Sequence, residues 1–193
     1  MTKKQKELAL AKIATEIEAC AICRENKIGR AVPGEGSADA EVVFVGEAPG
    51  KQEAASGRPF IGRAGKVLRG LIEEIGLNAE EIFITSAVKY LPEHVTPKPE
   101  EVAHGRAHLF QQLDIIQPKI VVLLGRVACL AVLGLFVQIA KEHGKVIEKD
   151  GKLFLIAYHP AAVLYSPAAR PLLVEDFQKL KKILKKCFQI MAI

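Results

Sequence analysis

Four short apolar segments recur along the chain, and turn-forming residues end each of them. They cover residues 41–45, 82–88, 119–124 and 153–157. Their length and their content of β-branched side chains predict strands that are buried on both faces. The stretch KVIEKDGKLFLIAYHP predicts a hairpin, with Asp150-Gly151 at its turn, that leads into the last of these strands.

Segments with helical periodicity alternate with these strands. Residues 63–75 place their apolar side chains on one helical face, and residues 99–116 begin with a proline and two glutamates, as helices often do. Further helices are predicted at the N-terminus, at residues 127–135 and from about residue 171 onward. This alternation predicts a three-layer α/β/α sandwich around a central four-stranded, mostly parallel sheet, and we expect residues 1–193 to form a single domain.

Polar side chains follow the predicted strands at the edge where ligands of such sheets bind. The first strand leads into Gly46-Glu47-Ala48-Pro49-Gly50, the second runs through Ser86, the third gives Arg126 and the fourth gives His159. We therefore expect a carboxylate, a hydroxyl, a guanidinium and an imidazole to converge on one rim.

The residue types at this rim suggest catalysis. Two glycines and Pro49 form a tight turn that lets a ligand approach the backbone, and Glu47 can orient a water or act as a base. The alternative, that Glu47 caps a helix or faces solvent, explains the Gly/Pro frame less well. His159 precedes a proline, which favours an extended conformation, and its imidazole can donate to an anionic leaving group. Phe60, in GRPFIG, either fills the core or stacks on a planar ligand.

Composition and charge narrow the class of protein. The net charge is +5, which suits a nucleic-acid partner, and no apolar run approaches the roughly 20 residues of a membrane span. The basic N-terminus predicts an amphipathic helix rather than a signal peptide. We therefore expect a cytoplasmic protein without membrane contact, whose four cysteines stay reduced.

Several motifs in fixed order carry a resemblance to a known family. The stretches are VFVGEAPG, GRPFIGRAGK, IFITSAVKYLP, TPKPEEV, PKIVVLLGR and YHPAAVLY. In this order the chain resembles the family 4 uracil-DNA glycosylases from about Cys20 to Lys181. The resemblance implies a uracil-DNA-glycosylase-like domain that flips a base out of DNA and breaks its N-glycosidic bond.

The resemblance also implies roles for individual residues. Glu47 would serve water activation, and His159 would donate to the pyrimidine O2 as charge develops there. The flipped base would contact Gly46, Ala48, Pro49, Phe60 and Ser86, with Phe60 stacking on it. Leu164 and Tyr165 would enter the vacated stack. Independently of the resemblance, the basic residues Lys51, Lys89 and Arg170 flank the predicted rim, and we expect them to contact DNA phosphates.

Two departures from the family pattern change the expectations. The family has asparagine where this chain has Ser86, so we expect weaker discrimination for uracil and a broader or different base preference. The family binds a [4Fe–4S] cluster through four cysteines. Cys20 and Cys23 match the first pair, but Tyr90 and Gly105 replace the other two. We therefore expect the cluster to be lost, Cys20 and Cys23 to be an incomplete remnant, and no other cofactor.

Two alternatives remain beside an active glycosylase with altered base preference. One is a catalytically weak relative that binds damaged or single-stranded DNA. The other is an unrelated nucleotide-binding α/β protein, against which the absence of GxxxxGK[ST] and GxGxxG counts. The enzyme is favoured because Glu47, Phe60 and His159 occur together, and we expect a monomer that acts on a flipped base in single- or double-stranded DNA.

Overall fold

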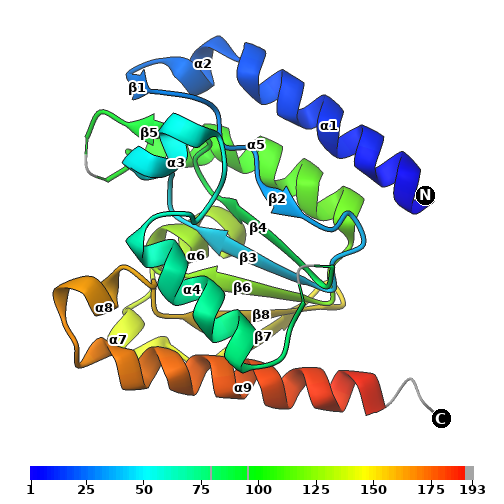
Figure 1. Ribbon diagram of the computed structural model, residues 1–193, viewed down its shortest axis with the longest axis vertical. Coiled ribbons are helices and arrows are strands. Elements are labelled where there is room, and N and C mark those ends of the chain that lie inside the picture. Colours follow the sequence, from blue (N-terminus) through cyan, green and yellow to red (C-terminus); the bar gives the residue numbers. More distant parts are fainter. Residues whose placement is uncertain (79, 95, 190–193) are drawn as a thin grey trace.

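A mixed β-sheet with helices on both faces forms the centre of the structure, a computed structural model that describes residues 1–78, 80–94 and 96–189 (Figure 1). Among these residues the sheet has six strands, in the order β2-β4-β3-β6-β8-β7. Their bounds are β2 Glu35–Gly36, β3 Val42–Gly46, β4 Ile82–Ser86, β6 Ile120–Leu124, β7 Val146–Lys149 and β8 Lys152–Ala157.

The four predicted strands are the central β4, β3, β6 and β8, which run parallel. The fold class is confirmed, but the predicted number of four strands is wrong, because β2 and β7 add antiparallel edges. β2 has only two residues, too few to show an alternating pattern. The predicted hairpin joins β7 to β8, and Asp150 and Gly151 both have positive φ, as a tight hairpin turn requires.

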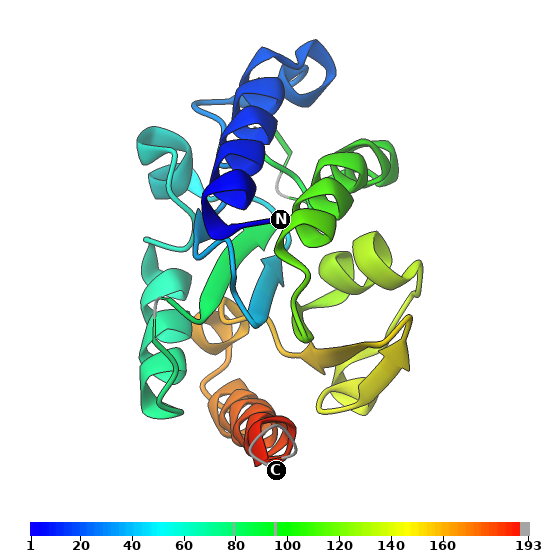
Figure 2. The ribbon, with the colours of Figure 1, turned by 90° about the vertical axis from the view of Figure 1, so that its right-hand side faces the viewer.

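Helices cover both faces of the sheet, as Figure 2 shows. α4 and α9 pack on one face, where Leu68, Leu173 and Phe177 are fully buried. α5 and α6 pack on the other. The helices are α1 Lys3–Ala19, α2 Ala21–Arg24, α3 Lys51–Ser56, α4 Arg63–Glu74, α5 Pro99–Ile116, α6 Arg126–Leu133, α7 Ile139–Glu142, α8 Ala162–Tyr165 and α9 Ala169–Gln189.

The N-terminal segment forms a small layer of its own outside α5. α1 lies against α5 (Figure 1), and α2 leads into a two-stranded ribbon of β1 (Lys27–Ile28) and β5 (Leu91–Pro92). A separate apolar cluster joins these parts and contains Ile13, Ile17, Cys23, Ala31 and Tyr90. In the part of the chain that the structure describes, no helix combines the length and apolar character needed to cross a membrane.

Candidate active site

A cavity of about 490 Å³ lies at the carboxyl ends of the parallel strands. Its walls come from the loop after β3, the start of α3, the loop before α4, the end of β4, and the segment from β8 into α8. The lining residues are Val32, Ala48, Pro49, Gly50, Lys51, Gln52, Glu53, Pro59, Phe60, Gly62, Arg63, Ala64, Ser86, His159, Ala161, Leu164 and Tyr165. This size is typical of small-ligand pockets.

The ring of Phe60 lies directly against Gly46, at the end of β3. A Cβ atom at position 46 would lie 2.6 Å from Cζ of Phe60, closer than any side chain tolerates. The same Cβ would lie 3.8 Å from Nε2 of His159, and the Phe60 and His159 rings are 5.9 Å apart between centroids. The absence of a side chain at Gly46 therefore lets an aromatic face and an imidazole meet at one point.

The loop that carries Phe60 is held in an uncommon conformation. Phe60 has a φ of 50°, which few residues other than glycine adopt. Oε1 of Glu53 accepts hydrogen bonds from the main-chain N–H groups of Ile61 and Gly62, at 3.0 and 2.8 Å. The guanidinium of Arg69 donates to the carbonyl oxygens of Pro59 and Phe60, at 3.1 Å each. These hydrogen bonds fix the ring over the cavity.

A hydrogen bond to the ring of His159 determines which of its nitrogens is the donor. Nδ1 accepts from the main-chain N–H of Ala161 at 3.1 Å, so the proton of the neutral ring is on Nε2. Burial lowers the pKa of His159 to about 4. At neutral pH the site therefore presents an uncharged imidazole whose Nε2–H is the donor next to Gly46.

Asp176 fixes the segment that precedes His159, and the sequence analysis missed it. This fully buried carboxylate on α9 accepts from the main-chain N–H of Tyr158 at 2.9 Å, and its other oxygen lies 2.8 Å from Nδ1 of His143. Burial raises the pKa of Asp176, and both hydrogen bonds oppose that rise. Asp176 lies three residues after Leu173 and four before Leu180, so it is an acid on the apolar face of α9. That spacing marks the residue as unusual but does not reveal its partners.

Ser86 lines the cavity from β4, next to β3. It is paired in register with Gly46, and its hydroxyl donates to the carbonyl oxygen of Val88 at 2.8 Å. That internal bond uses the single proton of the hydroxyl, so Ser86 offers the cavity only acceptor lone pairs. An asparagine amide would offer a donor as well.

Of the predicted rim, Ser86 and His159 line the cavity, whereas Glu47 and Arg126 lie beside it. Glu47 is half-buried in the turn after β3, where its carbonyl oxygen accepts from the N–H of Val88. Burial raises the pKa of the Glu47 carboxyl, and the positive charge of Arg126 opposes that rise. The four strand ends are brought together as expected, but the carboxylate and the guanidinium stand outside the residues that line the pocket.

Four of the five residues predicted to contact DNA are exposed or line the cavity. Lys51, Leu164 and Tyr165 line the mouth of the cavity, where Tyr165 is 89 % exposed, and Arg170 is exposed near the start of α9.

Lys89 does not belong to that surface, and its predicted contact with DNA is wrong. The side chain is 1 % exposed, and its ammonium donates to Oγ1 of Thr85, Oε1 of Gln112 and the carbonyl of Ser86 at 2.7–2.8 Å. Lys89 therefore supports β4 from inside.

A family model described as the uracil DNA glycosylase superfamily matches residues 33–186 of the chain. The chain belongs to this superfamily. The matched range contains every cavity residue discussed above except Val32, and it begins after Cys20 and Cys23. This match confirms the family membership that the motifs indicated.

Curated members of the superfamily cover most of the chain. The type-4 uracil-DNA glycosylase of Sulfurisphaera tokodaii is 42 % identical over 187 residues, which cover 91 % of this chain and 84 % of that protein. The type-4 uracil-DNA glycosylase of Archaeoglobus fulgidus is 41 % identical, with 92 % and 94 % covered. A type-5 uracil-DNA glycosylase of Pyrobaculum aerophilum is 33 % identical, with 69 % and 66 % covered.

The residues around Cys20 and Cys23 do not fit the [4Fe–4S] cluster that family 4 uracil-DNA glycosylases bind through four cysteines. Tyr90 packs beside Cys23 in the small apolar cluster of the N-terminal layer. At position 105, a Cβ atom would lie 2.2 Å from the carbonyl oxygen of Ala87, so this backbone has no room for a cysteine side chain. Cys129 lies instead in the core beneath α6. Cys187 lies where the structure describes no side chains.

The contact between Phe60 and Gly46 predicts an unequal effect of two glycine substitutions. Gly46→Ala should lower the free energy of unfolding by about 1–3 kcal/mol, because the new methyl group overlaps the ring. Gly70 lies in α4 with open space around it, so Gly70→Ala should raise the free energy of unfolding by up to about 1 kcal/mol. Denaturant unfolding measures both.

A double-mutant cycle tests the cause of the Gly46→Ala effect. Adding Phe60→Ala should remove most of the cost of Gly46→Ala, because the overlapping ring is gone. Additive effects of the two substitutions would show that the ring does not pack on Gly46.

Proposed function

We propose that this superfamily member is a DNA glycosylase that removes uracil or another deaminated base from DNA by hydrolysing the N-glycosidic bond. The observation that carries the proposal is the pairing of a neutral, Nε2-protonated His159 with the Phe60 ring over the bare backbone of Gly46. The names of the similar proteins point to the same reaction.

The cavity supports binding of a base that has left the DNA stack. A flipped pyrimidine would stack on Phe60, and the main chain of Gly46, Ala48 and Pro49 would contact its edge. Its O2 atom would lie near Nε2–H of His159. As the C1′–N1 bond breaks, the electron pair moves onto the base, and this donor stabilises the negative charge that develops on O2. Because its pKa is about 4, the imidazole is uncharged at neutral pH, and the donor is the Nε2–H of the neutral ring.

The sugar left behind carries positive charge and reacts with water. Glu47 lies in the turn next to Gly46, where its carboxylate can stabilise the oxocarbenium-like sugar and orient the incoming water. Water adds its oxygen to C1′ and gives up a proton, and the departing base takes up a proton. The products are a free base and an abasic site. In this scheme Arg126 favours the ionised form of Glu47.

The mouth of the cavity suits the flanking DNA. Tyr165 and Leu164 project from the short helix α8 and would occupy the space that the flipped nucleotide leaves. Lys51 is exposed at this mouth, and Arg170 is exposed near the start of α9, where it lines a separate hollow beside α4; both would contact phosphates. A net charge of +5 favours approach to DNA in general.

An assay of base excision tests the proposed function. The protein is incubated with labelled single- and double-stranded oligonucleotides that each carry one uracil or hypoxanthine, and alkali then cleaves the abasic sites. Cleavage is expected for the natural protein, and His159→Ala should slow it at least about 100-fold by removing the O2 donor. His94→Ala, which removes an exposed histidine, serves as the matched control and should change nothing. Tight binding of every oligonucleotide without cleavage would instead support a DNA-binding relative.

Ser86 predicts a relaxed choice of base. Because its hydroxyl proton is engaged by Val88, it cannot donate to the base edge. Ser86→Asn should raise the ratio of uracil to hypoxanthine excision by about 10-fold, since one buried hydrogen bond is worth about 1–3 kcal/mol. Single-turnover rates on both oligonucleotides measure this ratio. Strict uracil specificity in the natural protein, unchanged by Ser86→Asn, would contradict this role.

A further inference from the structure

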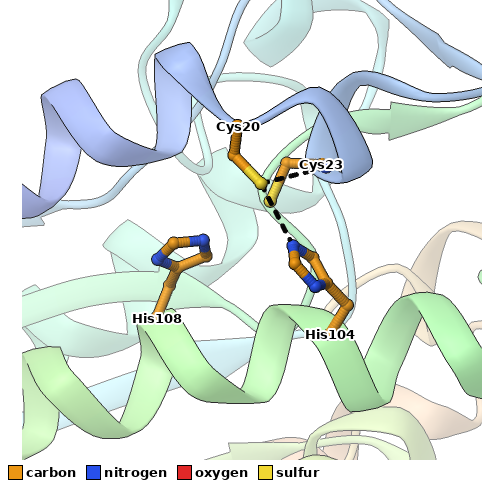
Figure 3. A group of neighbouring side chains, drawn as sticks. All are labelled: Cys20, Cys23, His104 and His108. Carbon is orange, nitrogen blue, oxygen red and sulfur yellow. Dashed lines mark hydrogen bonds between the residues drawn. The ribbon is translucent and has the colours of Figure 1, made fainter.

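Two cysteines and two histidines, far apart in the chain, meet in the N-terminal layer (Figure 3). The ligand atoms of Cys20, Cys23, His104 and His108 all lie within 4.8 Å of one another. Sγ of Cys20 and Nε2 of His104 are 3.2 Å apart. None of these four residues lines the cavity of the candidate active site.

Local structure explains why the four side chains point to one place. Cys20 ends α1 and begins α2, and Cys23 lies one helical turn later. The main-chain N–H of Cys23 donates to Sγ of Cys20 at 3.4 Å, which orients that sulfur. His104 and His108 are four residues apart on α5, so both project from the same face toward the sulfurs (Figure 3).

The spacing of these atoms suits one metal ion rather than an iron–sulfur cluster. With zinc–sulfur distances of about 2.3 Å and zinc–nitrogen distances of about 2.0–2.1 Å, tetrahedral ligand atoms are about 3.3–3.8 Å apart. The observed group needs only a small contraction to reach this arrangement. A four-iron cluster would bind each ligand to a different iron atom and would hold the ligands further apart.

The histidines also leave a polar group without a partner. Nδ1 of His108 is buried and has no hydrogen-bond partner in the structure. A buried unsatisfied group calls for an explanation, of which a missing ion is one. A metal bound by this ring would fix its orientation and offset the cost of its burial.

We propose that Cys20, Cys23, His104 and His108 bind one zinc ion. Two thiolates and two imidazoles form a full tetrahedral set without a position for water, as in structural zinc sites. The mixture of sulfur and nitrogen donors selects against Mg²⁺ and Ca²⁺, which prefer oxygen. The two cysteines are then ligands of a different metal site, not the remnant of a cluster.

The place of the site in the fold indicates its role. The ligands come from the junction of α1 and α2 and from α5, so the ion ties the N-terminal layer to the helix beneath it. The apolar cluster of this layer is small. Zinc binding, which deprotonates the two cysteine thiols, would therefore add to the free energy of unfolding of the layer. Because the ion is closed off from the cavity, it stabilises the fold and takes no part in the reaction.

Metal analysis of the purified full-length protein tests the proposal. We expect about one zinc ion per chain, a colourless protein and little iron or sulfide. Replacement by Co²⁺ should produce the visible bands of tetrahedral cobalt with thiolate ligands. Either iron with inorganic sulfide in stoichiometric amount, or four free thiols and no metal after expression with added zinc, would overturn the proposal.

Variants link the metal to the four residues. His108→Ala and Cys20→Ser should each reduce bound zinc to below about 0.2 per chain, whereas the control His94→Ala should keep it. A strong chelator should lower the Tm of the natural protein by about 5 °C or more and leave the Tm of His108→Ala unchanged. If a ligand variant fails to fold, chelation and zinc addition on the natural protein still decide. An unchanged Tm in chelator, with zinc retained in both ligand variants, would contradict the assignment. Base excision is a separate readout, so failure of either proposal leaves the other standing.

Discussion

The contact between the Phe60 ring and the bare Cα of Gly46 is the constraint on which the site depends. β3 lies inside the sheet, between the parallel strands β4 and β6, so its last residue has a strand end on either side. Only a residue without a side chain leaves space there for the ring, and the ring stands 5.9 Å from the imidazole of His159. The hydrogen bonds of Glu53 and Arg69 hold the ring in this place at the cost of an unfavourable backbone angle.

Burial then sets the chemistry of the groups around that contact. Desolvation keeps His159 neutral, and the N–H of Ala161 selects its tautomer, so the fold itself prepares the donor. The side-chain ammonium of Lys89 donates to β4 and to Gln112 of α5, and so links the two elements. The main-chain carbonyl of Lys89 accepts a hydrogen bond from the N–H of Val32. Val32 lines the cavity. On α5, Gln112 lies one turn after His108, so the same face of this helix carries the partner of Lys89 and the two histidines of the proposed zinc site. The N-terminal layer and the wall of the candidate active site therefore share one supporting helix.

The features that depend on local pattern were predictable from the sequence. The four central strands, the helix at residues 99–116 and the Asp150-Gly151 hairpin follow from apolar runs, caps and turn residues, and the structure has them within one or two residues. The strand ends meet because parallel strands end at one edge. The family motifs then supplied Phe60, which the strand pattern alone left open.

The features that depend on distant partners were not predictable in this way. Glu53 holds a loop nine residues ahead, and Asp176 holds Tyr158 from another element, and nothing in their local sequence marks these pairings. Lys89 was expected to contact DNA because it follows the second strand at the predicted rim, whereas its side chain is buried and donates to groups of β4 and α5. The histidine pair did leave a signal, since two histidines four residues apart in a helix share one face. The Cys-x-x-Cys pair was compared only with the four-cysteine pattern.

The most direct test of the account is the protonation state of His159 in the free protein. Heteronuclear NMR of the ¹⁵N-labelled imidazole, with His159→Gln used for assignment, reports both the tautomer and the pKa. The account predicts a neutral ring protonated at Nε2 throughout pH 5.5–8, because its pKa is about 4. A ring that titrates near 6.5, or that carries its neutral-state proton on Nδ1, would contradict it.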